Sequence, residues 1–275
     1  MKLSEAAARL RAAGIAEPML EARLLFSRFG GLSDAALYGA NPQIEDACIE
    51  PFLCRREKRE PMAYILGEQG FYRETYCVTP DTLIPREDTE ILVDYAVRHL
   101  KAGARFADLC TGSGCIALSV LNNTAATSAL AVDISKGALA VARENAQRLS
   151  LSSRVHFLEG DVLSKKILEA LCEQAPFDAI LCNPPYVSEK MFLTLAPEIF
   201  FEPKSALVSA QEGMLFYRRL TPVLLPMICE GGFLAFEIGY DQGARMQALA
   251  EENGCTCALI KDLSGNTRLA VLRRS

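Results

Sequence analysis

The tetrapeptide Asn183-Pro184-Pro185-Tyr186 carries the most specific chemical signal in the sequence. It follows an apolar run, and two successive prolines lack N–H donors, which leaves the Pro184 carbonyl directed outward rather than into a strand ladder. The Asn183 side-chain oxygen and that carbonyl are two acceptors aimed at one point, which suits an NH₂ group with two donors. Tyr186 can lie against such a nitrogen or against a cationic methyl group. A turn that merely closes a strand is the alternative interpretation.

A second group of candidate residues lies at 108–117, between a strand pattern and a helical pattern. Gly112 and Gly114 let the backbone approach a ligand closely and accept positive φ angles. A further strand then delivers Asp133, 19 residues after Gly114, where a carboxylate can accept hydrogen bonds from both ribose hydroxyls. Together these residues indicate a nucleoside cofactor, with a tight structural turn as the alternative.

The loop alone does not separate a dinucleotide from S-adenosylmethionine. A pyrophosphate prefers free N–H groups without a nearby anion, whereas Asp108 would repel it and could pair with a methionine ammonium. Asp161, after the third strand, could accept from an adenine amino group, or could cap the helix ahead of Val162. Three carboxylates after three successive strands fit a ligand with ammonium, ribose and adenine. We therefore expect S-adenosylmethionine to contact Asp108, Thr111, Gly112, Gly114, Asp133, Asp161 and Asn183.

Alternating strand and helix patterns over residues 90–275 must position these side chains. Helices are expected at 90–101 and 135–149, the second capped by Ser135. This alternation predicts an α/β fold, a mostly parallel, Rossmann-like seven-stranded sheet covered on both faces. The last two strands have almost no helix between them, which predicts an antiparallel edge hairpin. The expected strands are 105–110, 128–133, 155–158, 177–183, 232–238, 256–261 and 268–272.

The N-terminal part has a different pattern. Residues 1–75 hold short helical patterns, such as Leu20, Leu24 and Leu25, and predict a small helical domain. That this domain recognises substrate is an expectation that the resemblance described below implies. Residues 76–89, with two prolines, predict a connector that is a strand pair, and residues 90–275 form the cofactor-binding catalytic domain.

Composition narrows the class of protein. The 275 residues are 50% hydrophobic and 23% charged, which excludes intrinsic disorder. A net charge of −5 argues against a direct nucleic-acid substrate. Because no long uncharged apolar run or secretion signal is evident, we expect a cytoplasmic protein without membrane contact. The ten cysteines lack metal-ligand spacing and only two histidines occur, so we expect reduced thiols and no metal.

Longer motifs carry a family resemblance. The segments DLCTGSGCIA, AVDIS, EGDV and NPPY, in this order and spacing, resemble class I S-adenosylmethionine methyltransferases acting on planar nitrogen. Four further stretches narrow the match: PMAYILG at 61–67, LIPREDTE at 83–90, FEP at 201–203 and EIG at 237–239. Over nearly its full length the chain resembles the protein-(glutamine-N5) methyltransferases of the PrmC/HemK family, which modify peptide chain release factors.

The resemblance implies methylation of the glutamine side-chain amide in the Gly-Gly-Gln motif of release factors, with S-adenosylhomocysteine as product. It implies that Asn183 and Pro184 grip the amide, that Pro185 and Tyr186 complete the substrate site, and that Asp133 and Asp161 hold the nucleoside. Cys110 stands where the family often has glycine, and should fit only if its φ angle is negative.

Other interpretations remain at this stage. An N-methyltransferase acting on an exocyclic amine of a nucleic-acid base could use the same tetrapeptide, although it must also grip phosphates. A nicotinamide-dependent dehydrogenase shares the glycine loop but has no use for Asn-Pro-Pro-Tyr, and a noncatalytic module would not need it. Arg86, Glu90 and Glu202 could line a substrate channel or form structural contacts. The charged run 55–60 is either a solvated helix end or a partner surface.

Overall fold

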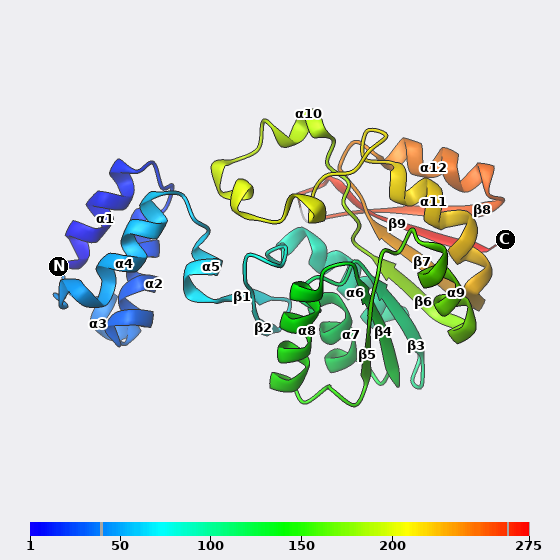
Figure 1. Ribbon diagram of the computed structural model, residues 1–275, viewed down its shortest axis with the longest axis horizontal. Coiled ribbons are helices and arrows are strands. Elements are labelled where there is room, and N and C mark those ends of the chain that lie inside the picture. The colour runs from blue at the N-terminus through cyan, green and yellow to red at the C-terminus, as the bar shows by residue number, and fades with distance from the viewer. Residues whose placement is uncertain (39–40, 263, 275) are drawn as a thin grey trace. The chain divides into compact units, whose positions relative to one another are not determined.

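The computed structural model describes residues 1–38, 41–262 and 264–274, which group into two compact units. The helical unit comprises Met1–Glu68 together with Ala196–Phe201, and the sheet unit comprises Gln69–Leu195 and Glu202–Ser275. Figure 1 labels the elements of both. Within the described residues, every helix is too short or too polar to span a bilayer.

The helical unit is built from short amphipathic helices around one small core. Leu3, Ala6 and Leu10 recur at helical spacing and are buried, because residues three and four apart share one face of a helix. Pro18 opens the second helix at a position that tolerates proline, and Gly31, with φ of 65°, ends it. The helices are α1 (Leu3–Ala12), α2 (Pro18–Gly30), α3 (Asp34–Tyr38), α4 (Asp46–Glu57) and α5 (Met62–Leu66).

The buried face of α2 differs from the one expected. The leucine pattern correctly indicates a helix, but Leu20 and Leu24 are 43% and 41% exposed, whereas Ala22, Leu25 and Phe26 are buried. The buried face therefore follows the smaller Ala22 and the larger Phe26, which fit the neighbouring helices. Periodicity identified the element but placed its inner face about half a turn away.

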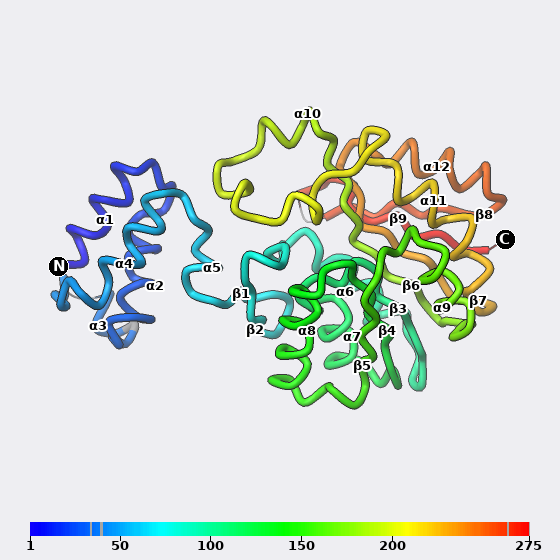
Figure 2. The backbone as a smooth tube through the Cα atoms, in the orientation of Figure 1, coloured from blue at the N-terminus to red at the C-terminus, as the bar shows by residue number. Residues whose placement is uncertain are grey.

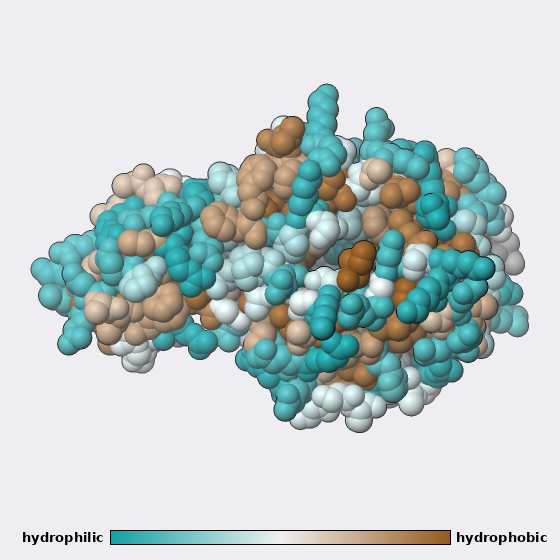
Figure 3. Space-filling view, in the orientation of Figure 1, coloured by the Kyte–Doolittle hydropathy of each residue, from teal (hydrophilic) through white to brown (hydrophobic). Residues whose placement is uncertain are grey.

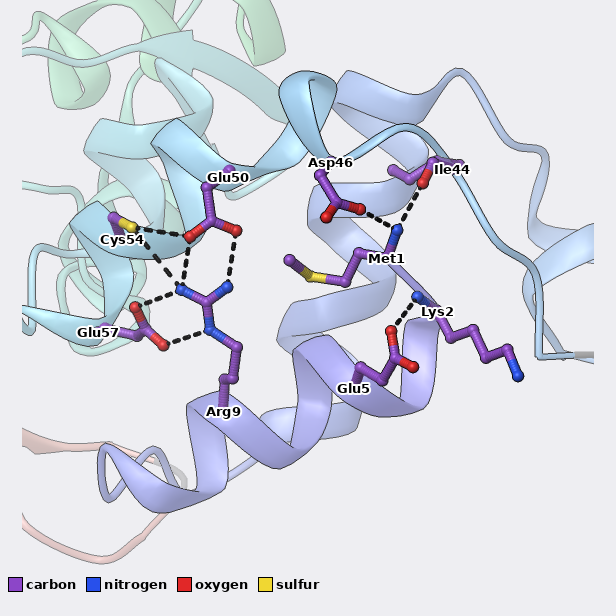
Figure 4. Close-up of polar contacts among 9 residues, drawn as sticks. All are labelled: Met1, Lys2, Glu5, Arg9, Ile44, Asp46, Glu50, Cys54 and Glu57. Atoms are coloured by element: carbon purple, nitrogen blue, oxygen red, sulfur yellow. Dashed lines mark hydrogen bonds and ion pairs between the residues drawn. The ribbon is translucent and has the colours of Figure 1, made fainter.

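Ion pairs join α1 to α4 inside the helical unit, as Figure 4 shows. The Arg9 guanidinium donates to both carboxylate oxygens of Glu57, at 2.7 and 2.9 Å, and to both of Glu50, also at 2.7 and 2.9 Å. The Cys54 thiol donates to Glu50 at 3.3 Å. These bonds to Glu57 and Glu50 raise the pKa of Arg9, so its charge is fully satisfied by structural partners.

The charged run 55–60 is likewise engaged within the helical unit. Arg56 is buried and donates to Glu21 at 2.6 Å and to Glu198 at 3.2 Å. Arg59 pairs with Glu198 at 2.7 Å and donates to the Gly14 carbonyl at 2.6 Å. Glu198 thereby ties the segment Ala196–Phe201 to the helices with which it is grouped. The run is structural and is not simply a solvated helix end.

The sheet unit confirms the predicted fold class. Its seven strands lie in the order β5-β4-β3-β6-β7-β9-β8; β3 to β7 are parallel, and β9 runs antiparallel to both β7 and β8. The chain path that brings β3 beside β6 can be followed in Figure 2. The strands are β3 (Arg105–Leu109), β4 (Ser128–Asp133), β5 (Val155–Glu159), β6 (Phe177–Cys182), β7 (Ile228–Glu237), β8 (Cys255–Lys261) and β9 (Thr267–Arg274).

Helices cover both faces of this sheet, which explains why its strands are apolar throughout. Along β7, Phe233 and Ala235 pack into one apolar cluster, while Leu234 and Phe236 pack into the other. The first cluster includes buried side chains from α6 and α7, and the second includes side chains from α11 and α12. The longer helices are α6 (Glu90–His99), α7 (Cys115–Asn123), α8 (Lys136–Arg148), α9 (Lys165–Gln174), α11 (Leu215–Leu224) and α12 (Gly243–Glu252).

The strand pair expected within 76–89 lies earlier in the chain. It is the hairpin of β1 (Glu68–Phe71) and β2 (Glu74–Cys77), so only its last residues reach that range. Residues 78–86 are irregular, because Pro80 and Pro85 supply no ladder donors. Short helices complete the structure: α10 (Glu189–Phe192) and the 3₁₀ turns Glu87–Thr89, Pro197–Phe201, Lys204–Ala206 and Leu225–Met227.

Candidate active site

A cavity of about 280 Å³ lies at the carboxyl ends of the central strands of the sheet unit. This is the edge at which open α/β sheets bind ligands, because the loops after adjacent parallel strands converge there. The cavity gathers many of the residues singled out in the sequence, which come from four different strand ends. Its walls include Thr111, Gly112, Asp133, Asp161, Asn183 and Pro185. Asp108, Gly114, Pro184 and Tyr186 are not among the lining residues.

The loop after β3 forms the floor of the cavity. Gly112 and Gly114 have φ angles of 55° and 81°, the left-handed region that favours glycine. A Cβ at Gly114 would lie 3.1 Å from Leu118 and 3.2 Å from Ala142, so a side chain there would crowd both helices. The Asn145 side chain donates to the Ser113 carbonyl at 2.9 Å and fixes the loop from α8.

Cys110 contradicts the expectation of a negative φ angle. Its φ is 61°, a left-handed conformation that costs a side-chain-bearing residue on the order of 1–2 kcal/mol. The neighbouring bonds hold the loop in place: the Thr111 N–H donates to the Val132 carbonyl at 3.0 Å, and the Cys110 thiol contacts the buried thiol of Cys182. Position 110 thus keeps a backbone conformation typical of glycine although its residue carries a side chain.

Asp108 is fully buried beneath the loop rather than exposed in the cavity. Its Oδ2 accepts from the Thr111 hydroxyl at 2.6 Å and from the Ala117 N–H at 3.1 Å, which ties the loop to α7. Its Oδ1 has no hydrogen-bond partner among the described residues. Burial raises the pKa of Asp108 to about 7, because desolvation disfavours the charged carboxylate.

Asp133 and Asp161 occupy the ends of the next two strands. The two Asp133 oxygens accept from the N–H groups of Gly112 at 2.8 Å and Ser135 at 2.9 Å, and burial raises its pKa. Asp161 is exposed, and its side chain accepts from the Leu163 N–H at 2.8 Å. Ser164 caps α9, so Asp161 faces the cavity without acting as that helix's cap.

The tetrapeptide after β6 is held from two sides. Asn183 donates from its side-chain nitrogen to the Thr89 hydroxyl at 3.2 Å, and the Tyr186 hydroxyl donates to Glu237 at 3.1 Å. The Tyr186 carbonyl accepts from Gln242 at 3.3 Å, and a Cβ at Gly213 would lie only 2.1 Å from it. Gly213 therefore allows a close backbone approach that keeps this turn in place.

Apart from Arg86, which the sequence suggested as a possible channel residue, sequence reasoning missed the contribution of the segment before α6. Asp81, Thr82, Leu83 and Thr89 line the cavity, as does Arg86. The motif at 83–90 was visible in the sequence, but nothing local indicated that an irregular segment would cover the cofactor loop. Its role becomes clear only when the chain is folded.

Arg86, Glu202 and Glu90 make hydrogen bonds and an ion pair that stabilise the fold. Glu202 is buried and accepts from the Ile84 N–H at 3.0 Å and from the Arg86 guanidinium in a very short ion pair. Glu90 accepts from the Tyr72 N–H at 2.7 Å and so supports the β1–β2 hairpin. Of these three residues, only Arg86 also reaches the cavity wall.

The charge of the cavity distinguishes between ligand classes. Among the described lining residues, Asp81, Asp133 and Asp161 face a single arginine, Arg86, which is already paired with Glu202. Such a wall disfavours a pyrophosphate or a nucleic-acid backbone and favours a ligand with positive charge. The three acidic lining residues, two of them at strand ends, fit S-adenosylmethionine, which carries an ammonium and a sulfonium.

Comparison with known proteins places the chain among enzymes. Residues 2–67 match the PrmC N-terminal domain, and residues 87–220 match the methyltransferase small domain. The release factor glutamine methyltransferase of Rhodospirillum rubrum is 38% identical over 99% of this chain and 84% of its own length. That of Caulobacter vibrioides is 36% identical over 96% of this chain and 92% of its own length.

The chain belongs to the release factor glutamine methyltransferase family. The resemblance inferred from the motifs is thus confirmed, and with it the enzyme class. The base-directed methyltransferase alternative is not favoured by these relatives.

Solved structures confirm the fold of the sheet unit. The ribosomal protein L11 methylase of Lactobacillus delbrueckii subsp. bulgaricus superposes with a TM-score of 0.52 at 21% identity, covering 75% of this chain and 90% of that one. Another methyltransferase-like structure, solved with S-adenosylhomocysteine, has a TM-score of 0.50 at 14% identity and covers 72% of this chain and 52% of that one. S-adenosylmethionine is accordingly the cofactor of this family's methyl transfer.

Proposed function

We propose that this protein transfers a methyl group from S-adenosylmethionine to the side-chain amide nitrogen of the glutamine in the Gly-Gly-Gln motif of peptide chain release factors. One observation carries the proposal: Asn183 commits its NH₂ group to Thr89, so its oxygen is left as an acceptor at the cavity wall. Together with the Pro184 carbonyl, this oxygen would provide two acceptors, which match the two donors of a planar NH₂ group, whereas a hydroxyl or a thiol has only one.

The surface beside the tetrapeptide supports a protein substrate. Helix α10 begins three residues after Tyr186, and Met191 and Leu193 there are 41% and 75% exposed. Figure 3 shows apolar side chains gathered over α10. Exposed apolar side chains of this size favour contact with another protein, whereas a nucleic-acid partner would require a basic surface.

Side chains and N–H groups at the strand ends would hold the cofactor. Asp133 is placed for ribose hydroxyls and Asp161 for the adenine amino group, while Thr111 and Gly112 line the side toward the methionine part. Asp108 and Gly114 act on that part through the shape and charge of the loop. When bound, S-adenosylmethionine supplies an electrophilic methyl group on a positively charged sulfur.

The residues of this chain would then orient the substrate amide relative to the methyl group. An amide nitrogen is a weak nucleophile because its lone pair is delocalised, so placing it in line with the methyl group is the main requirement. The Asn183 oxygen and the Pro184 carbonyl accept the two N–H groups and turn the face of the amide toward the donor. These bonds strengthen as positive charge develops on the nitrogen, which stabilises the transition state more than the bound substrate.

Two further parts of the proposal concern recognition of the release factor and the cellular compartment. The helical unit, whose sequence matches the PrmC N-terminal domain, is the part that we propose recognises the release factor. All ten cysteines are free thiols, in keeping with a reducing compartment, and we propose that the reaction takes place in the cytoplasm.

The experiment incubates a purified release factor with this protein and S-adenosylmethionine, followed by intact-mass and peptide mass spectrometry. We expect one added methyl group, mapped to the glutamine of the Gly-Gly-Gln motif and absent when that glutamine is replaced by glutamate. The variant Asn183→Ala should abolish the added mass, whereas the exposed Asn266→Ala should leave it unchanged. Methyl transfer to RNA or DNA instead of the release factor would contradict the proposed substrate.

A further inference from the structure

Three side chains form a chain of contacts behind the tetrapeptide. Glu237 ends β7, which pairs with β6, and Cys182 at the end of β6 directly precedes Asn183. Thr89 lies between them: its hydroxyl accepts from Asn183 at 3.2 Å and interacts with the Glu237 carboxyl group. Thr89 and Glu237 are each 2% exposed, so solvent does not compete for these contacts.

Glu237 also contacts the second functional side chain of the tetrapeptide. Its Oε1 accepts from the Tyr186 hydroxyl at 3.1 Å. Its Oε2 is buried and has no partner with good hydrogen-bond geometry among the described residues. One carboxyl group therefore connects both Tyr186 and, through Thr89, Asn183.

The chemistry of these groups dictates the direction of the hydrogen bonds. An ionised carboxylate can only accept, so in the interaction between Thr89 and Glu237 the Thr89 hydroxyl is the donor. The Thr89 oxygen can then only accept, and the group of Asn183 that faces it must be the NH₂ group. That orientation leaves the Asn183 oxygen free to accept from a substrate amide.

We propose that Glu237 is a positioning residue whose carboxylate, acting through Thr89, holds Asn183 with its oxygen toward the substrate amide and simultaneously fixes Tyr186. This inference rests on the proposed function, since it concerns how the same site binds the glutamine amide. It assigns a role to a residue that touches neither substrate nor cofactor.

Protonation of Glu237 would remove this control. A protonated carboxyl group can donate to Thr89, which then can donate to the Asn183 oxygen and turn the asparagine NH₂ group toward the substrate. The NH₂ group of Asn183 can only donate, so it could not accept from the NH₂ group of the substrate amide. The substrate amide would then lose its hydrogen bond to Asn183. Burial raises the pKa of Glu237 to about 7, so this change falls within a readily measured pH range.

Charged neighbours act on Glu237 from the elements around it. Arg268 on β9 favours the carboxylate, and Asp88, which is paired with Arg268 at 2.8 Å, disfavours it. The Tyr217 hydroxyl donates to the main-chain carbonyl of Glu237 at 2.9 Å. The other titratable groups that act on it are Tyr186, Cys115 and Cys182.

The test measures kcat at saturating cofactor and release factor from pH 5 to pH 9. For the natural protein we expect kcat to fall as pH decreases below about 7, approaching tenfold per unit, because the ionised fraction of Glu237 falls. Glu237→Gln should lower kcat at pH 8 by on the order of 10-fold or more and flatten this profile. Its dissociation constant for S-adenosylmethionine, measured by calorimetry, should stay within about threefold.

A second pair of variants keeps the inference testable if Glu237→Gln fails to fold. Thr89→Val removes the hydroxyl at nearly constant volume and should reduce kcat by about tenfold, whereas Thr89→Ser, which retains the hydroxyl, should restore it. A flat profile in the natural protein, or a Thr89→Val variant with unchanged kcat, would overturn the inference. If the natural protein transfers no methyl group to the release factor at pH 8, the proposed function fails instead.

Discussion

Charged side chains have different partners in the two units of the molecule. In the helical unit, Arg9 donates to Glu50 and Glu57, and the buried Arg56 donates to Glu21 and Glu198. In the sheet unit, Asp108 and Glu237 are buried, yet no ion pair among the described residues includes either one. Burial raises the pKa of each to about 7.

This difference distinguishes charged side chains that stabilise the fold from charged side chains that are available to act on a ligand. A buried arginine with two carboxylates is already satisfied and has no need of a ligand. A buried carboxylate without a cation is costly, and its cost falls when a positively charged ligand binds nearby. The sheet unit therefore keeps acidic groups that have no direct ion pair beside the cavity at which we propose that S-adenosylmethionine binds with its ammonium and sulfonium groups. Each prediction below would weaken or sharpen that distinction.

The largest effect is expected from Asn183→Ala. The variant removes a substrate acceptor and leaves the cofactor loop intact, so kcat should fall by on the order of 100-fold or more. Single-turnover rates and a cofactor titration check this result, and the dissociation constant for S-adenosylmethionine should change little. Unchanged turnover would remove Asn183 from the proposed mechanism.

Asp133→Ala should weaken cofactor binding. Asp133 accepts from the Gly112 N–H and is proposed to bind the ribose, so its loss should raise the dissociation constant for S-adenosylmethionine by on the order of 10- to 100-fold. Asp241→Ala, an exposed aspartate that pairs with Arg245, is the matched control and should change it little. Equal effects of the two variants in calorimetry would contradict the placement of the nucleoside.

Buried Glu237 should make stability depend on pH. Because its pKa in the folded protein lies above its ordinary value, its contribution to stability is full at pH values below about 4.5 and is lost as pH rises through about 7. The Glu237→Gln variant should not lose stability in this way, because glutamine does not ionise. Urea unfolding at pH 5 and pH 8 should show the variant gaining stability relative to the natural protein by on the order of 2 kcal/mol. A constant difference between the two proteins would show that Glu237 does not ionise in this range.

The smallest effect is expected in the helical unit. Arg9→Met removes the ion pairs but keeps much of the packing, and should lower the free energy of unfolding by about 1 kcal/mol or less, with a smaller loss at high salt. Cofactor affinity should be unchanged. If Arg9→Met instead weakened cofactor binding as strongly as Asp133→Ala, the division between structural and functional charge would be wrong.

Much of the fold could be predicted because it depends on repeated local patterns. The strand expected at 128–133 is β4 itself, and the expected helix at 135–149 is α8 with Ser135 as its cap. Asp133 and Asn183 come together because the carboxyl ends of parallel strands share one edge of a sheet. The edge hairpin followed from the short connection between the last two strands.

The remaining features depend on tertiary contacts that no local pattern reveals. The irregular segment containing Asp81 and Thr89 covers the cavity only after the chain has folded back over the sheet unit's cofactor loop. The positive φ of Cys110 is imposed by its neighbours against its own preference. Glu237 was visible as part of a motif, but its contacts with Tyr186 and Thr89 join residues far apart in the sequence.

Proton release on cofactor binding tests the account of uncompensated charge most directly. Titration calorimetry of S-adenosylmethionine at pH 6.5, in two buffers with different heats of protonation, should reveal release of up to about one proton, because a cationic ligand lowers the pKa of Asp108 from about 7. S-adenosylhomocysteine, which lacks the sulfonium charge, should release fewer, and Arg9→Met should behave like the natural protein. No release, or equal release with both ligands, would contradict the central claim that the buried Asp108 carboxylate is kept without an ion pair for a cationic ligand.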